Sequence, residues 1–153
     1  MLQTRQLVAL LLLLSATSAC SPAPTPSPTP SVTIEQAADA YRSFTATWSA
    51  THSDVLNAAA AAADVDPAMV AAYATAIADS YTAFADGVRA IEVPGSVLPA
   101  KQAELETLTA VVGLAKQLEA EPANITVKTE LQGALARVAQ TSANIEALLG
   151  ISN

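Results

Sequence analysis

Apolar residues recur at helical spacing in four segments of the chain, and a proline lies at each break between segments. Steps of three, four and seven residues place side chains on one face of a helix, whereas proline interrupts a helix because it lacks a backbone N–H. Within residues 33–150 the breaks fall near 64–67, 94–99 and 121–122. Four amphipathic helices of similar length, joined by short breaks, predict an all-α fold: an antiparallel up-down-up-down four-helix bundle.

The apolar stripes also predict the core, because the apolar face of each helix has to be buried. Alanine dominates a hydrophobic content of 52%, and only 4% of the residues are aromatic. This composition favours helices, since alanine has the best intrinsic helix propensity. The expected core residues are Ile34, Ala37, Tyr41, Phe44, Trp48, Val55 and Ala62; Val70, Tyr73, Ile77, Tyr81, Phe84, Val88 and Ile91; Leu105, Leu108, Val112, Ala115 and Leu118; and Leu131, Leu135, Val138, Ser142, Ile145 and Leu149.

Several residues at the expected helix ends are suited to satisfying free backbone groups. Thr33 and Gln36 fit a capping box at the start of the first helix. Asp66, followed by a proline, predicts the N-cap of the second helix, and Ser96 predicts that of the third. Gly150 is the expected terminator of the fourth helix.

Three glycines lie inside the expected helices, at Gly87, Gly113 and Gly133. An internal glycine costs about 1 kcal/mol relative to alanine, but it also lets two helix backbones approach closely. The sequence leaves both interpretations open.

The first residues of the chain have the layout of a secretory signal peptide. Arg5 supplies a positive charge, Leu7–Leu14 form a short apolar run, and Ser15–Ala19 are small. The apolar run is too short for a membrane-spanning helix, which needs about 20 residues. We therefore expect this leader to direct export and then to be removed.

The end of the leader resembles a bacterial lipobox, in which small residues precede the cysteine that becomes the lipidated first residue of the mature protein. The resemblance is carried by Ala16–Cys20, and Thr17 stands where leucine is usual. Cys20 is the only cysteine, so no intramolecular disulfide can form. The resemblance implies a diacylglycerol thioether on Cys20 and two or three acyl chains, which hold a protein stably on a membrane.

Alternating prolines follow the cysteine, in the run SPAPTPSPTPS from Ser21 to Ser31. Such a segment joins neither helix nor sheet and favours an extended polyproline II conformation. We expect it to act as a spacer. The predicted organisation is a lipoprotein signal peptide at 1–19, a lipidated cysteine and tether at 20–32, and the bundle at 33–150.

The formal net charge of −7 limits the kinds of partner. Loss of Arg5 with the leader leaves six basic against fourteen acidic residues, a charge of −8. Nucleic-acid binding depends on basic side chains, so this balance argues against it. It also argues against electrostatic adhesion to anionic lipids, which leaves the lipid on Cys20 as the expected membrane contact.

All six aromatic residues lie in the first two expected helices, where a hairpin folded about Val65 places Trp48 opposite Tyr81 and Phe84. They form either an aromatic core or a pocket whose tyrosine hydroxyls line a small-ligand site. The candidate pocket residues are Tyr41, Phe44, Trp48, His52, Tyr73, Tyr81 and Phe84.

The chain lacks the patterns that carry catalysis or bind metal. His52 is the only histidine, whereas zinc takes three or four protein ligands, and no Glu-x-x-His pair is present for a di-iron centre. The side chains of residues 52–54 point about 100° apart on a helix, so they cannot form a catalytic relay. We therefore predict a protein that is not an enzyme, with no catalytic residue, no metal and no cofactor.

The acidic residues inside the expected helices do not pair on one helical face. Glu104 and Glu106, and likewise Asp79 and Asp86, are expected to be solvated charges.

The mature part resembles the small, alanine-rich helical lipoproteins of high-GC bacteria. The resemblance is carried by the leader, the tether, Ala40-Tyr41, and the run FADGVRAI at Phe84–Ile91 leading into Val93-Pro94. It implies no catalytic residue. The anchor and the tether, together with the lack of a catalytic pattern, predict a lipid-anchored, extracytoplasmic and non-enzymatic interaction or binding module, whose partner is a protein or small ligand. The alternative is a small-molecule or haem-type carrier that uses the aromatic first hairpin.

Overall fold

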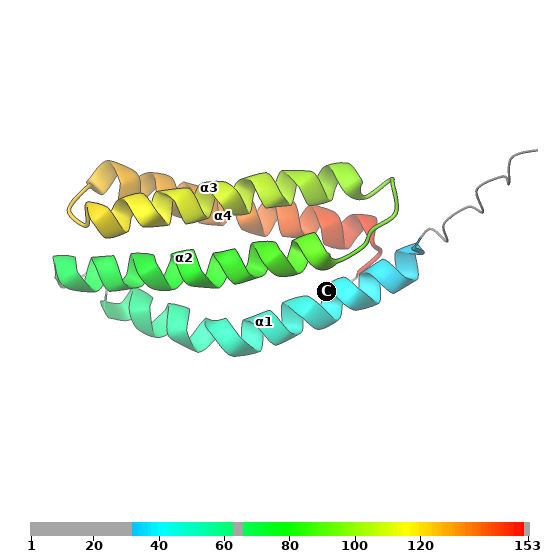
Figure 1. The fold of residues 1–153 in the computed structure, drawn as a ribbon, viewed down its shortest axis with the longest axis horizontal. Helices are drawn as coiled ribbons and strands as arrows, with labels where there is room; N and C mark the ends of the chain where they lie inside the picture. Colours follow the sequence, from blue (N-terminus) through cyan, green and yellow to red (C-terminus); the bar gives the residue numbers. More distant parts are fainter. Residues whose placement is uncertain (1–31, 63–65, 152–153) are drawn as a thin grey trace, which may run out of the picture.

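The computed structural model describes residues 32–62 and 66–151. Consecutive helices in this part run in opposite directions and lie side by side (Figure 1). They are α1 (Ile34–Ala62), α2 (Pro67–Ala90), α3 (Leu98–Ala120) and α4 (Ile125–Leu148). The predicted all-α four-helix bundle is confirmed. The expected leader, lipidated Cys20 and most of the tether lie outside the described residues.

The predicted start signals of α1 and α2 are confirmed. The Thr33 backbone N–H donates to the Gln36 side-chain oxygen at 3.0 Å, and the Gln36 N–H donates to the Thr33 hydroxyl oxygen at 3.2 Å. This is the reciprocal pattern of a capping box. The Asp66 carboxylate accepts a hydrogen bond from the Ala68 N–H at 2.9 Å.

The predicted Ser96 cap of α3 is wrong. The N-cap is Val97, which makes no side-chain capping bond. Residues 95–97 instead form a turn, in which the Val97 N–H donates to the Pro94 carbonyl at 2.9 Å. Pro99 then occupies the first turn of α3, where its missing N–H would have had no helical partner in any case.

The end of α4 confirms Gly150 as a terminator. Its φ is +70°, in the left-handed region that favours glycine. The Ile151 N–H donates to the Glu146 carbonyl at 2.8 Å, and the Gly150 N–H donates to the Ala147 carbonyl at 3.2 Å. These are the two bonds of a Schellman motif.

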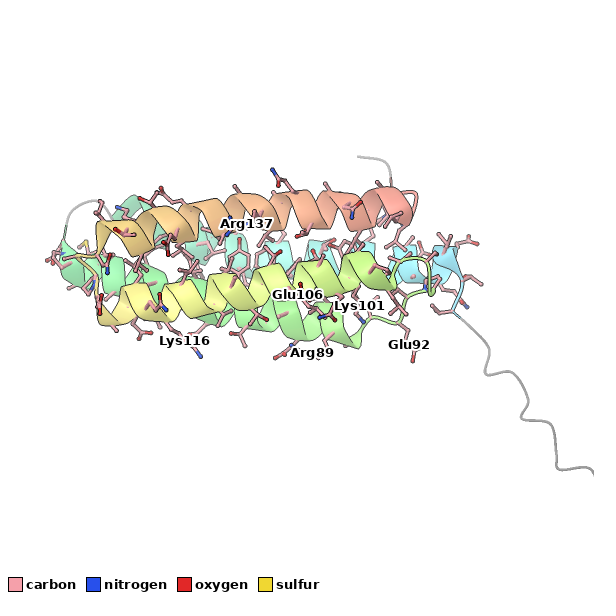
Figure 2. The ribbon with its side chains drawn as sticks, turned by 90° about the horizontal axis from the view of Figure 1, so that it is seen from above. Arg89, Glu92, Lys101, Glu106, Lys116 and Arg137 are labelled. Atoms are coloured by element: carbon pink, nitrogen blue, oxygen red, sulfur yellow. The ribbon has the colours of Figure 1, made fainter. Side chains whose placement is uncertain are left out.

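The C-terminal end of α2 is held by a lysine of α3. The Lys101 ammonium donates to the Arg89 carbonyl at 2.9 Å and to the Ile91 carbonyl at 2.5 Å. Figure 2 shows Lys101 and Arg89 at this end of the α2–α3 pair. A cation at a helix C-terminus satisfies free carbonyls and complements the helix dipole.

The buried face of α3 differs from the predicted stripe. Its buried residues are Ala100, Glu104, Leu108, Val111, Ala115 and Leu118, whereas Leu105 and Val112 are half-buried. α3 packs against both α2 and α4, so its buried face is centred between its two contact surfaces. Two corrections follow: Val111 replaces Val112 in the core, and Glu104 is not a solvated charge.

α1 is the least buried helix of the bundle. Its fully buried side chains in residues 34–58 are Ala37, Ala38 and Tyr41, all in its first turns. The predicted core residues Ile34 and Val55 are 47% and 53% exposed. α1 packs mainly on α2, so only a narrow part of its apolar stripe finds a partner.

α1 also curves away from a straight axis (Figure 1). Three hydroxyls on it donate to the carbonyl four residues earlier: Thr47 to Ser43, Thr51 to Thr47, and Ser53 to Ser49, at 2.9, 2.9 and 2.6 Å. Such back-bonding often bends a helix, but it also occurs in the other helices, for example from Thr82 to Ala78 at 2.7 Å, so it does not by itself account for the curvature of α1. No helix in the described part carries an apolar stretch long enough to cross a bilayer.

The three internal glycines have different surroundings. A Cβ at Gly87 would overlap the ring of Phe44, whereas one at Gly113 would meet nothing within 4 Å. A Cβ at Gly133 would meet only the Arg137 guanidinium, at 4.0 Å. Gly87 therefore permits the close approach of α1 to α2, and the other two do not serve packing.

Substituting these glycines by alanine separates the two cases. Gly113→Ala is expected to stabilise the fold by about 0.5–1 kcal/mol, because alanine is the better helix former. Gly87→Ala is expected to destabilise it by about 1–3 kcal/mol, because the Phe44 ring has to move. Urea unfolding followed by circular dichroism measures both changes. Equal stabilisation by the two variants would contradict the packing role of Gly87.

Candidate functional site

Two groups of side chains are candidates for a functional site. The first is an aromatic cluster between α1 and α2, formed by Phe44, Trp48, Tyr81 and Phe84. Ring centroids lie 4.8 Å apart for Trp48 and Phe84, 5.6 Å for Trp48 and Tyr81, and 5.2 Å for Phe44 and Phe84. The hairpin pairing predicted from the sequence is confirmed. Tilted and edge-on rings at these distances attract one another and bury apolar area.

The aromatic cluster is tied to the α2 backbone through its tryptophan. The Trp48 indole N–H donates to the carbonyl of Ser80 at 2.9 Å. His52, one turn further along α1, stacks on Trp48 with ring centroids 5.4 Å apart. These contacts fasten the middle of α1 to α2.

Two of the predicted pocket residues, Tyr41 and Tyr73, are not among the packed rings of the cluster, although Tyr73 lies near enough to Tyr81 to raise the pKa of its phenol. Tyr41 points into a separate buried group described below. Tyr73 is half-buried on α2; burial raises the pKa of its phenol, and the nearby Lys128 ammonium lowers it. Burial also raises the pKa of Tyr81. The structure therefore brings five of the seven predicted residues together and places two elsewhere.

An open groove of about 550 Å³ lies beside the cluster on the α1–α2 surface. Of the predicted pocket residues, His52 alone lines it. Its lining residues are His52, Val55, Ala72, Thr75, Ala76, Asp79 and Ser80. The aromatic rings thus pack against one another and do not form the wall of this groove.

The second group, the Glu104 hub, consists of Glu104 of α3, Tyr41 of α1 and Ser142 of α4. The Tyr41 hydroxyl donates to Glu104 Oε1 at 2.9 Å, and the Ser142 hydroxyl donates to the same oxygen at 2.5 Å. Glu104 is 0% exposed and Tyr41 is 1% exposed. Glu104 Oε2 is also buried and has no hydrogen bond within the described residues. Three helices therefore meet at one carboxyl group.

The surroundings of Glu104 favour its neutral form. Burial raises the pKa of the carboxyl above its ordinary value, since a charge in an apolar interior loses its hydration. The Ser142 and Tyr41 hydroxyls lower that pKa by donating to the ionised form, and the Glu146 carboxylate raises it by repulsion. For Tyr41, burial and the neighbouring Glu104 both raise the pKa of the phenol.

The sequence does not predict the hub, because an isolated glutamate in a helix is typical of a solvated surface charge. The available signal was register: Glu104 stands four residues after Ala100 and four before Leu108, both of which are buried. Glu106, two residues further on, is exposed on the outer side of α3 (Figure 2). Asp79 and Asp86 are exposed too, as predicted.

The two groups differ in how far they are open to solvent. A substrate has no access to Glu104 or Tyr41 unless α1 moves, since these side chains expose almost no surface. Within residues 32–62 and 66–151, no three His, Cys, Asp or Glu side chains are placed to share a metal ion. The chemistry available at the hub is the uptake and release of a proton.

Truncation of Trp48 tests how strongly the aromatic cluster holds α1. Trp48→Phe keeps a ring but loses the indole N–H, and is expected to cost about 0.5–1.5 kcal/mol. Trp48→Ala removes the ring as well and is expected to cost about 3 kcal/mol, near the low end for large core residues because Trp48 is half-buried. Urea unfolding compares the two variants. Equal costs would show that the ring contacts do not hold α1.

Comparison with known proteins gives no match for this chain among protein-family models, curated proteins or solved structures.

Proposed function

We propose that this protein is a lipid-anchored, non-enzymatic interaction module on the extracytoplasmic side of a bacterial cell membrane. The lipobox-like run ending at Cys20 and the proline-rich spacer after it support the anchor. One observation carries the non-enzymatic part of the proposal. The buried polar side chains and the Trp48 indole form hydrogen bonds between helices. Such a body suits contact with another molecule rather than turnover.

The geometry of the bundle fits presentation away from a surface. The chain enters α1 at one end of the bundle, and the α3–α4 connection lies at the opposite end (Figure 1). The 24 residues of α2 span about 36 Å at 1.5 Å per residue. An extended spacer of the length of Ser21–Ser31 adds about 34 Å. The far end of the bundle would then stand up to about 70 Å from the anchor.

Substituting the lipid attachment site tests the anchor. The wild-type protein is expected in the membrane fraction, with a mature chain that begins at Cys20 and carries a thioether-linked diacylglycerol. Cys20→Ser is expected to leave the membrane fraction, because the remaining surface is acidic and is repelled by anionic lipid. Fractionation and intact-mass spectrometry measure both properties. A Cys20→Ser protein that stays firmly membrane-bound would refute the anchor.

The groove beside the aromatic cluster favours one alternative, a small-molecule or haem-type carrier. Its volume is within the range of ligand sites, and Val55, Ala72 and Ala76 give it an apolar lining. A ligand site, however, normally buries 70–90% of its ligand, and this groove is open to solvent. We therefore prefer the interaction module.

Filling the groove tests that preference. Native mass spectrometry and visible absorbance of the purified full chain are expected to show the lipidated protein with no co-purified compound. Ala76→Trp places a large ring in the groove, and Ala83→Trp, on an exposed part of α2, is the matched control. A compound that co-purifies with wild type and Ala83→Trp but not with Ala76→Trp would establish the carrier instead.

A further inference from the structure

The three members of the Glu104 hub lie at one level of the bundle. Tyr41 comes seven residues after the start of α1, Glu104 six after the start of α3, and Ser142 six before the end of α4. At 1.5 Å per residue this is about 10 Å from the end at which the chain enters α1. The hub therefore joins α1 to α3 and α4 near the point where the expected tether begins.

α1 depends on few contacts for its position. Beyond Tyr41 its side chains in the described part are at most half-buried, and its main neighbour is α2. Its attachments are the buried Ala37 and Ala38, the aromatic cluster on α2, and the Glu104 hub on α3 and α4. Helices with few buried contacts open at lower free energy than the rest of a fold.

The hub is also an attachment of α1 that contains a buried titratable carboxyl group. Among the described residues, the titratable groups that act on Glu104 are Tyr41 of α1 and Glu146 of α4. The charged residues of α2, Asp79, Asp86 and Arg89, are exposed. No cation of residues 32–62 or 66–151 acts on the buried carboxyl to offset ionisation. An ionised Glu104 would leave Oε2 charged, desolvated and without a hydrogen bond, which is costly in an apolar interior.

We propose that the Glu104 hub is a proton-dependent latch, which holds α1 against α3 and α4 more firmly when Glu104 is protonated. One proton taken up by the carboxylate gives the neutral acid. Tyr41 and Ser142 still donate to Oε1 in that form, and the buried charge is gone. Release of the proton weakens the attachment of α1 without breaking the α2–α3 and α3–α4 contacts.

The sign follows from linkage. In the folded protein the pKa of Glu104 is raised above the value of about 4.5 that it has when exposed. The stabilising effect of protonation is fully present below that value, and it is lost as the pH rises through the folded-state pKa. α1 is therefore expected to loosen on going from acid to neutral pH. This inference goes beyond the proposed function, because it requires neither a lipid nor a partner.

Hydrogen exchange measured by mass spectrometry on the detergent-purified full chain, between pH 4.5 and 8 and corrected for intrinsic exchange rates, tests the latch. Protection of α1 peptides is expected to fall as the pH rises. The total fall is up to tenfold for each unit by which the pKa of Glu104 in the folded protein exceeds its pKa in the unfolded chain. Peptides from the middle of α3 are expected to change much less. Glu104→Gln should abolish the pH dependence of α1, whereas Glu106→Gln, on the exposed side of α3, should retain it.

Variants of the two hydroxyl donors, Tyr41 and Ser142, distinguish the latch from a purely structural role of Glu104. Tyr41→Phe and Ser142→Ala each remove a hydrogen bond that favours the ionised carboxylate. Both are expected to move the midpoint of the α1 transition to higher pH. If Glu104→Gln fails to fold, this shift decides the question alone. A midpoint unmoved or lowered by both, or a pH dependence of α1 that is unchanged in a folded Glu104→Gln, would overturn the proposal.

Discussion

Burying a carboxyl group inside a helical bundle is costly, and the arrangement of three helices at Glu104 is what offsets that cost. A group with no exposed surface loses its hydration, so it either finds hydrogen-bond donors or becomes neutral. Here the Tyr41 and Ser142 hydroxyls supply two donors from two other helices. Sliding α1 or α4 by one turn, about 5.4 Å, would remove a donor, so the hub fixes the register of these helices.

The fold itself could be predicted from the sequence because its determinants act within one helical turn, at a break between helices, or within one hairpin. Prolines mark the breaks, the Thr33–Gln36 and Asp66 caps act within one turn, and the aromatic pairs follow from folding one hairpin. The predicted Ser96 cap is wrong because of the packing of the neighbouring residue. Val97 is buried, so the turn of residues 95–97 is held by packing rather than by a capping side chain.

The aromatic cluster could be predicted from the sequence, because it follows from folding one hairpin. The Glu104 hub could be predicted only in part: its register marks Glu104 as facing inward, but its donors come from distant segments. Glu104 and Leu105 are adjacent, so their side chains point about 100° apart on the helix, and hydrophobicity alone favours leucine as the residue that faces the core. In the structure Glu104 is the buried residue, because α3 is packed between α2 and α4. Tyr41 and Ser142, which lie 63 and 38 residues away in the sequence, donate hydrogen bonds to it. Val55 is exposed for a similar reason: an apolar stripe on a helix is buried only where another helix covers it.

The aromatic cluster and the Glu104 hub, two attachments of α1, depend on different physical quantities, and this gives the bundle an uneven response to its environment. The aromatic cluster rests on apolar area and on the packing of the Phe44, Trp48, Tyr81 and Phe84 rings. The Glu104 hub rests on the charge state of one carboxyl group. The cluster also lies deeper along α1 than the hub, which is nearer the end where the chain enters. A change in pH therefore acts first on the segment between the expected tether and Trp48, while Gly87 and the rings keep the middle of α1 on α2.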